Sequence, residues 1–317
     1  MQWKIARPGR LADRFNRWAI RRGFPALIWL APRVPHWFLR AGARVIIGVV
    51  FLLYPAPKAA VARNLARVLD LPPDSAPVRR AVWRMFFHLA IYWSDLFRFA
   101  QLPAERARAQ VVGGSLATLE PLQAARAAGE RVILMTGHLG NWELGGVLAG
   151  QAGLPVSILY VPDAFGDAEH FRSLLRSFGN LEEIPIRPAE PFASLPVLRA
   201  FASGRVIALQ GDRDFNERGV RMPFLGAEAS FPPGPFHLAR MTGAKIWPVF
   251  IAYTPDYRFQ IELGEPIAVE RTEDRQGDVR RALERWVAVL EVAVRRWPTQ
   301  WYTFYDFWAR DEGGSVP

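Results

Sequence analysis

The sequence predicts an α/β protein with a mixed, mostly parallel sheet that is flanked by helices. The main observation is an alternation between residues 115 and 265, where short apolar, β-prone runs alternate with longer runs that have apolar residues at helical spacing. The second observation is that no internal repeat or low-complexity linker divides the chain. We therefore expect a single domain over residues 1–317, with an N-terminal helical region at 1–57 and an α/β core at 115–301.

The first 60 residues alternate arginines with bulky apolar side chains, and Pro25, Pro32 and Pro35 divide them into short helices. Aromatic and aliphatic groups of this kind enter the headgroup boundary of a membrane, while arginines meet lipid phosphates. The longest apolar run, 45–54, is about half of the roughly 20 residues that a spanning helix needs. We expect a peripheral or monotopic element on an anionic membrane surface. The alternative is a helix pair that packs on the protein's own core.

Residues 58–102 are expected to form two helices, separated by Pro72 and Pro73. The second helix, at 78–102, carries aromatic residues on most of its sides, so it is expected to be buried or to face an acyl chain or lipid. His88 and Asp95 lie on this helix, and we interpret both as structural.

The α/β core then follows in order. We expect helices at 115–128, 141–151, 167–178, 193–203 and 234–243, and strands at 131–136, 156–161, 181–186, 205–210 and 220–225. Two strands at 245–253 and 257–263 are expected to close the sheet as a hairpin. A long helix at 277–297 precedes an aromatic C-terminal tail, which together with helix 78–102 is a candidate wall for an apolar ligand.

The composition narrows the classes of partner. The formal net charge is +10, and lysine occurs only at positions 4, 58 and 245, so the positive charge is nearly all arginine, which binds phosphate bidentately. This indicates nucleic acid, an anionic membrane surface or an acidic substrate. The 12 tryptophans and 21 phenylalanines favour the membrane interface. The absence of cysteine excludes disulfides, thiolate metal sites and a cysteine nucleophile. No secretory signal is predicted.

The strand at 131–136 leads directly into His138, and Glu143 follows five residues later. Chemistry in open α/β sheets gathers at the carboxyl ends of strands, so a histidine and a carboxylate here resemble a general base and its orienter. Gly140 and Asn141 lie between them and are expected to contact substrate, Gly140 through an amide donor for an oxyanion. A core histidine at a strand end is the structural alternative.

A second polar cluster, Asp212-Arg213-Asp214, follows the strand at 205–210 and is expected to face the same cleft. Two acids around an arginine either bind a metal with a sugar phosphate, lock a loop by salt bridging, or position a substrate. Arg172 and Arg176, one helical turn apart, either clamp a phosphate or form a solvated face. The proline-rich loop at 231–235 either directs the amide end of helix 234–243 at an anionic ligand or is a structural turn.

These motifs together carry a resemblance. His138-Leu139-Gly140-Asn141-Trp142-Glu143 resembles the His-x-x-x-x-Asp/Glu motif of the lysophospholipid acyltransferase superfamily, in the form found in lipid A late acyltransferases and the related phosphatidylinositol mannoside acyltransferases. Further landmarks follow in family order: Arg63-Asn64-Leu65, the segments 211–215, 220–226 and 238–250, and Pro298-Thr299-Gln300-Trp301. The ordered set covers nearly the whole chain and is more specific than the single motif.

The resemblance implies a glycerol-phosphate-acyltransferase-like fold and a membrane O-acyltransferase. The fatty acyl chain would pass from an acyl carrier protein or CoA thioester to a hydroxyl of a glycolipid such as a lipid A precursor, at the cytoplasmic face of the inner membrane. By motif position His138 is the base and Glu143 its partner, without a metal, cofactor or covalent intermediate. Arg172, Arg176, Arg213, Asp212 and Asp214 are candidate substrate contacts.

One departure concerns the third motif block, where many members of the superfamily have Phe-Pro-Glu-Gly and this chain has Pro233 in place of the glutamate. Glu228 and Asp212 are candidates for the binding role of that glutamate. Three alternatives remain: an acyltransferase for another lipid acceptor, a metal-dependent glycosyltransferase that uses Asp212 and Asp214, and a non-enzymatic basic binder. Nucleic acid is not an expected partner, because the arginine–aromatic pattern lies in the first 100 residues and matches no recognised binding module.

Overall fold

The computed structural model describes residues 22–23, 25–53, 55–112, 117–162, 173–174, 176–177, 179, 181–186, 195–214 and 218–308. A six-stranded sheet in the order β3-β2-β4-β1-β7-β8 forms the centre, and all neighbours are parallel except the antiparallel pair β7–β8. Its strands are β1 (Val132–Thr136), β2 (Val156–Tyr160), β3 (Glu182–Pro185), β4 (Val206–Gln210), β7 (Lys245–Tyr253) and β8 (Phe259–Leu263). The predicted mostly parallel sheet and its closing hairpin are therefore confirmed.

Strand β1 is buried along its whole length because it packs against apolar layers on both sides. Val132 and Leu134 belong to one core cluster, whereas Ile133 and Met135 belong to the other, as the alternation of side chains along a strand requires. The first layer includes α6 (Glu120–Ala127) and α7 (Trp142–Gln151), and the second includes α9 (Leu195–Ala202), α10 (Gly234–Thr242) and α11 (Arg275–Arg296).

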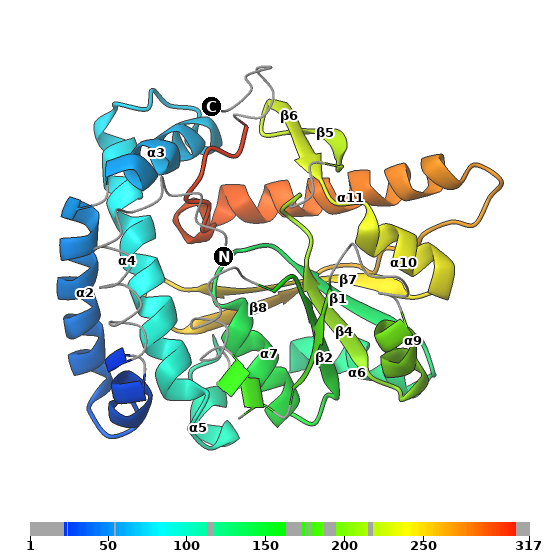
Figure 1. The fold of residues 1–317 in the computed structure, drawn as a ribbon, viewed down its shortest axis with the longest axis horizontal. Helices are drawn as coiled ribbons and strands as arrows, with labels where there is room; N and C mark the ends of the chain where they lie inside the picture. The colour runs from blue at the N-terminus through cyan, green and yellow to red at the C-terminus, as the bar shows by residue number, and fades with distance from the viewer. Residues whose placement is uncertain are drawn as a thin grey trace.

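Three helices form a block at one side of the sheet: α2 (His36–Leu53), α3 (Pro55–Leu69) and α4 (Ala76–Phe99) (Figure 1). The helix α4 lies between α2 and the rest of the molecule, and a short helix α5 (Ala104–Arg108) follows it. Ser75 caps the first turn of α4 by accepting a hydrogen bond from the Val78 amide. Most aromatic side chains of α4 are buried, which is one of the two environments that its pattern predicts.

The outer helix α2 keeps much of its apolar surface in contact with solvent. Trp37 is 71% exposed and Leu52 is 75% exposed, and Phe38, Val45, Ile46 and Val49 are exposed as well. Inward-facing contacts attach α2 to α4, because the buried carboxylate of Asp95 accepts hydrogen bonds from His36 at 2.6 Å and from Arg40 at 3.0 Å. The structural role that we assigned to Asp95 agrees with this contact.

No single helix in the described ranges is long and apolar enough to cross a membrane. Two consecutive helical segments, His36–Leu52 and Pro57–Leu69, together have the length and composition of a membrane span, but the chain bends by 99° between them. The first 21 residues of the expected membrane-associating region, and most of the expected helix 167–178, lie outside the described residues.

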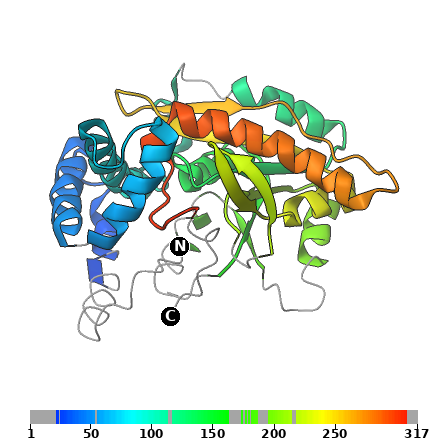
Figure 2. The same cartoon turned by 90° about the horizontal axis from the view of Figure 1, so that it is seen from above.

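A separate two-stranded ribbon, β5 (Val220–Phe224) and β6 (Ala227–Phe231), packs beside α11 (Figure 2). The sequence predicted the first strand but not the second. Leu225 has φ of 53° and Gly226 has φ of 79°, so the two central residues of the turn both adopt the left-handed conformation that favours a tight hairpin. The expected helix 115–128 is shorter than predicted and consists of a 3₁₀ turn (Ala117–Leu119) followed by α6.

Candidate active site

His138 lies in the loop that connects β1 to α7, at the carboxyl edge of the sheet. The loop is held from two directions. The His138 carbonyl accepts a hydrogen bond from the Tyr302 amide at 2.8 Å, and the Gly140 amide donates to the Gln300 carbonyl at 2.9 Å. Gly140 has φ of 66°, and a Cβ atom added there would lie 1.9 Å from the Ile251 carbonyl oxygen. The close approach of β7 therefore requires glycine at this position.

The side chain of His138 is paired with Asp212. The Nδ1–Oδ1 distance is 2.7 Å, and the other carboxylate oxygen accepts hydrogen bonds from the His138 amide at 2.9 Å and from Trp301 Nε1 at 3.1 Å. The sheet register explains this meeting. Thr136 of β1 lies opposite Gln210 of β4, so the residues two positions further along each chain leave the sheet side by side.

Charge and burial set the protonation state of this pair. Burial and the positive charge of Arg213 lower the pKa of His138 to about 4, against the opposing influence of Asp212. Burial alone would raise the pKa of Asp212, but the charge and hydrogen bonds of His138, together with Arg213, hold it below its usual value. Asp212 is therefore ionised and only accepts, so Nδ1 carries the proton and Nε2 keeps a lone pair.

Glu143 does not make the contact with His138 that the sequence motif suggested. It is the second residue of α7, and its buried carboxylate accepts hydrogen bonds from Arg176 Nε at 2.8 Å and Nη2 at 2.6 Å. Arg176 Nη1 donates to Glu183 of β3 at 2.6 Å. The carboxylate that contacts the His138 imidazole is therefore that of Asp212, because the first turn of α7 directs Glu143 toward the edge strands. Arg176 is 4% exposed and belongs to this buried ion-pair network rather than to a solvated face.

Asn141, expected to contact substrate, is fully buried and bonded within the protein. Its side-chain oxygen caps α7 by accepting from the Leu144 amide, and its Nδ2 donates to the Tyr92 carbonyl and the Tyr253 hydroxyl. The Gly140 amide, expected to serve an oxyanion, is taken by the Gln300 carbonyl. Both residues shape the loop that presents His138.

The remaining expected site residues divide into separate environments. Arg213 is buried next to Asp212 and donates from Nη2 to the Tyr302 carbonyl at 2.5 Å. Asp214 accepts hydrogen bonds from the Gly219 amide and the Ser230 hydroxyl, so it supports its own loop. Glu228 is half exposed on β6, 4.0 Å from Arg221. Arg172 lies outside the described residues. Because Asp212 and Asp214 serve different protein donors, the pair does not have the arrangement of a shared metal site.

The C-terminal strap, residues 298–308, contacts the site in a way that its sequence does not indicate. Gln300 bonds both the amide and the carbonyl of Tyr253, and Trp301 bonds Asp212. Asn64 of α3 in turn binds the strap by donating to the Thr303 and Tyr305 carbonyls. The contacts of Asn64 and Gln300 therefore fix the strap beside His138 and Asp212.

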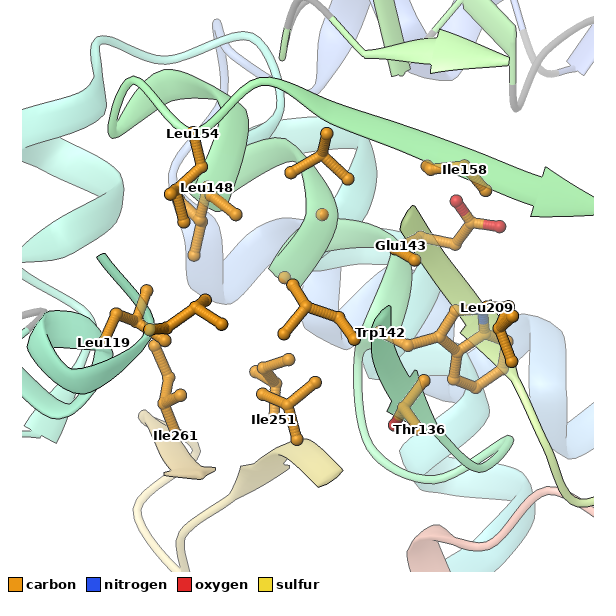
Figure 3. Close-up of a pocket in the computed structure, with 18 of the residues that line it drawn as sticks. Leu119, Thr136, Trp142, Glu143, Leu148, Leu154, Ile158, Leu209, Ile251 and Ile261 are labelled. Atoms are coloured by element: carbon orange, nitrogen blue, oxygen red, sulfur yellow. The ribbon is translucent and has the colours of Figure 1, made fainter. Parts of the chain in front are cut away.

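An apolar cavity of about 70 Å³ lies between the sheet and α7. Figure 3 shows Leu119, Leu148 and Leu154 at one end of this cavity and Thr136, Trp142 and Glu143 at the other. The Trp142 ring packs edge-on against His138, with 5.2 Å between centroids, and it also lines the cavity, so His138 lies next to the cavity. The lining comes from the sheet, the α6 region and α7; helix 78–102 and the aromatic C-terminal tail, the walls that the sequence suggests, do not line it.

The arrangement is that of a neutral, oriented imidazole beside an apolar cavity, which suits proton removal from a hydroxyl. The chain is also similar to known acyltransferases. Residues 20–310 match the family model described as bacterial lipid A biosynthesis acyltransferase. Phosphatidylinositol mannoside acyltransferase of Mycobacterium tuberculosis (strain ATCC 25618 / H37Rv) is 30% identical over 242 residues, which cover 73% of this chain and 71% of the relative. The protein of the same name from Mycolicibacterium smegmatis is 28% identical over 264 residues, or 78% and 79% of the two chains.

Proposed function

Because the chain belongs to the bacterial lipid A biosynthesis acyltransferase family, and is therefore an acyltransferase, we propose that it transfers a fatty acyl chain to a hydroxyl of a membrane glycolipid. The donor is a thioester of acyl carrier protein or CoA. The observation that carries this proposal is the buried His138–Asp212 pair, in which Nδ1 is bonded to the carboxylate and Nε2 is left to accept a proton. The acceptor is a glycolipid such as a phosphatidylinositol mannoside or a lipid A precursor, and the mycobacterial relatives support this class.

The reaction follows from the protonation states. His138 Nε2 takes the proton of the acceptor hydroxyl as its oxygen attacks the thioester carbonyl carbon, so a C–O bond forms and a tetrahedral intermediate results. Asp212 stabilises the imidazolium and keeps its orientation. Collapse of the intermediate breaks the C–S bond, and the imidazolium returns the proton to the departing thiolate. Each catalytic group then has its starting charge.

Glu143 acts in this proposal as a positioning residue. It anchors the first turn of α7 to Arg176, and α7 begins immediately after the His138 loop. The pair is almost fully buried, so removing one partner would leave a charge in a region of low dielectric. The motif carboxylate and Asp212 thus have different tasks: one fixes the helix that follows the base, and the other fixes the imidazole itself.

The apolar cavity is the proposed binding site for the acyl chain. It begins at Trp142, which contacts the base, and its far end is closed by leucines. Its volume is about half of the roughly 150 Å³ that admits a benzene molecule in an engineered cavity, so a long chain enters only when these side chains rotate. Flexible leucine and isoleucine side chains, rather than backbone, form the closed end.

The exposed side of α2 is the proposed membrane contact, at the cytoplasmic face of the inner membrane. Trp37, Phe38 and Ile46 give it an apolar surface, and arginines such as Arg33 and Arg44 accompany them. Burying exposed apolar area in lipid favours association, and arginines add attraction to anionic headgroups. The protein would then meet both acyl donor and lipid acceptor at the membrane surface.

The proposal is tested with purified protein, a radiolabelled acyl thioester and candidate glycolipids, together with mass spectrometry of lipids from cells with and without the gene. We expect one lipid to differ in mass by one acyl group and His138→Ala to abolish its formation in vitro. Near-full transfer by His138→Ala would refute the general-base assignment. An unchanged lipid profile, together with no transfer in vitro, would refute the glycolipid acceptor.

A further inference from the structure

The tetrahedral intermediate of acyl transfer carries a negatively charged oxygen, which N–H groups fixed in the site stabilise best. The Gly140 amide, which the sequence predicts for this task, donates instead to the Gln300 carbonyl. The carboxylates of Asp212 and Glu143 only accept hydrogen bonds when they are ionised. The oxygen therefore requires another donor close to His138.

The apolar cavity has a small group of polar side chains in the part of its lining that the structure describes: Thr136, Glu143 and Gln210, together with the indole of Trp142. The Thr136 hydroxyl donates to the Gly137 carbonyl at 3.3 Å, and the Glu143 carboxylate accepts from Arg176. The side chain of Gln210 makes no hydrogen bond with any described residue. Its amide therefore offers two N–H groups to a ligand.

The strand register places Gln210 beside the catalytic pair. Gln210 of β4 lies opposite Thr136 of β1, and two positions further along the chain Asp212 bonds the side chain of His138. Two residues span at most about 7 Å, so the Cα atoms of Gln210 and Asp212 lie within that distance of each other. Val206, four positions earlier on β4, packs in the core layer that includes α7, so Gln210 faces the same layer and the cavity.

Gln210 also lies where the cavity approaches the surface. It borders a larger pocket, of about 440 Å³, that opens at the carboxyl ends of β2 and β4. The leucines that close the cavity, Leu119 and Leu154, lie at the opposite end from Thr136 and Trp142 (Figure 3). An acyl chain in the cavity would thus have its methyl end among the leucines and its thioester at the end that Gln210 shares with Thr136.

We propose that Gln210 is a catalytic residue whose side-chain N–H donates to the carbonyl oxygen of the acyl thioester. This inference rests on the proposed function, because it assigns Gln210 to the same reaction. As the acceptor oxygen attacks, the π electron pair of the carbonyl moves onto its oxygen, and the amide stabilises the oxyanion that results. When the C–S bond breaks, this electron pair returns and forms the carbonyl of the ester. Gln210 keeps both of its protons, and His138 alone transfers the proton.

The indole N–H of Trp142 is a second donor at this end of the cavity. Its ring packs against three other rings, with centroid distances of 4.9 Å to Tyr92, 5.2 Å to His138 and 6.0 Å to Tyr302. This packing, rather than a ligand, fixes the direction of its single N–H. The amide of Gln210 has two N–H groups on a side chain that can rotate, so it can follow the oxygen from the thioester to the intermediate.

Three variants separate these donors. Gln210→Met removes the amide with little change in length, and methionine is compatible with an apolar lining. Gln260→Met is the matched control, because Gln260 is also partly buried on a strand, β8, but lines neither pocket. Trp142→Phe removes the indole N–H and keeps an aromatic ring. Urea unfolding checks that each variant is folded, and Gln210→Leu replaces Gln210→Met if the latter is not.

Steady-state acyl transfer to the glycolipid measures the effect of each change. We expect Gln210→Met to lower kcat by about 10²–10³-fold, as the loss of one oxyanion donor does, while the KM for the thioester stays close to the wild-type value. Gln260→Met should keep the wild-type kcat. A rise in KM alone, an unchanged kcat, or a loss of kcat confined to Trp142→Phe would overturn the proposal. In each of these cases transfer by the wild type would still support the proposed function.

Infrared spectroscopy of the bound acyl thioester, labelled with ¹³C at its carbonyl, gives a readout that does not depend on turnover. The His138→Ala background prevents transfer during the measurement, and a carbonyl that accepts a hydrogen bond absorbs at lower frequency than one that does not. We expect the additional change Gln210→Met to move the band to higher frequency and the additional change Gln260→Met to leave it in place. A band that Gln210→Met does not move would show that the amide does not contact the carbonyl.

Discussion

Asp212→Asn tests whether Asp212, rather than Glu143, orients the base. The Asp212 carboxylate receives three donors: His138 Nδ1, the His138 amide and Trp301 Nε1. An asparagine has the same shape but only one acceptor oxygen. If that oxygen faces Nδ1, the amide NH₂ meets the two other donors, and each buried donor left unsatisfied costs about 1–3 kcal/mol. In the opposite orientation the oxygen still accepts from the His138 amide and from Trp301, so this orientation is expected.

In that orientation the NH₂ group faces Nδ1 and donates to it. The proton of the neutral imidazole then moves to Nε2, which no longer has a lone pair for the acceptor hydroxyl. We expect kcat to fall by about 10³-fold or more, as when a base is held in the wrong tautomer. The pKa of His138 should fall further, because Asp212 opposes its lowering in the wild type.

Single-turnover transfer of a radiolabelled acyl chain measures the rate, and ¹⁵N NMR of the histidines reports the tautomer. Glu143→Gln is the matched variant, since it makes the same chemical change in the motif carboxylate. In this variant Arg176 keeps its ion pair with Glu183, at 2.6 Å. We therefore expect the free energy of unfolding to fall by about 1–3 kcal/mol and His138 to keep its wild-type tautomer. A collapse of kcat in Glu143→Gln, with near-normal Asp212→Asn, would refute the assignment.

Three further predictions follow from the same geometry. Because His138 must be neutral and its pKa is lowered to about 4, kcat/KM should decline only as the pH falls toward that value; an inflection near 6.5 would contradict this. Gly140→Ala should reduce the free energy of unfolding, measured with urea, by about 2–4 kcal/mol, because the added Cβ would collide with Ile251. Gly146→Ala, on α7, is the control and should cause no such loss, because its Cβ would make only ordinary van der Waals contacts. Leu154→Ala should open the far end of the apolar cavity and shift preference toward longer acyl chains in competition between donors; an unchanged preference would refute the proposed chain path.

The strands of the sheet were predictable because their signals are local. The run 131–136 is apolar without interruption, as a strand buried on both faces has to be, and it became β1. The ribbon partner β6 was missed because Ala227–Phe231 mixes charged, small and aromatic residues and has no continuous apolar run. Its pairing with β5 depends on the turn at Leu225 and Gly226.

The partner of His138 could not be read from spacing along the chain. Glu143 is close in sequence, but the start of α7 directs it toward Arg176. Asp212 is distant in sequence and becomes adjacent only because β4 is the neighbour of β1. The strand order was the missing information. If the pairing of β1 with β4 were known, the register of Thr136 with Gln210 would indicate that His138 and Asp212 lie side by side at the edge of the sheet.

The contacts of the C-terminal strap have a consequence for the order in which the protein is made. A chain that stops before Gln300 contains every strand of the sheet, yet it lacks the Trp301 donor to Asp212 and the Gln300 and Tyr302 contacts to the His138 loop. Translation delivers this segment after every strand of the sheet. The sheet can therefore form while the His138 loop is still unsupported, and the arrangement around His138 is complete only when the strap has docked.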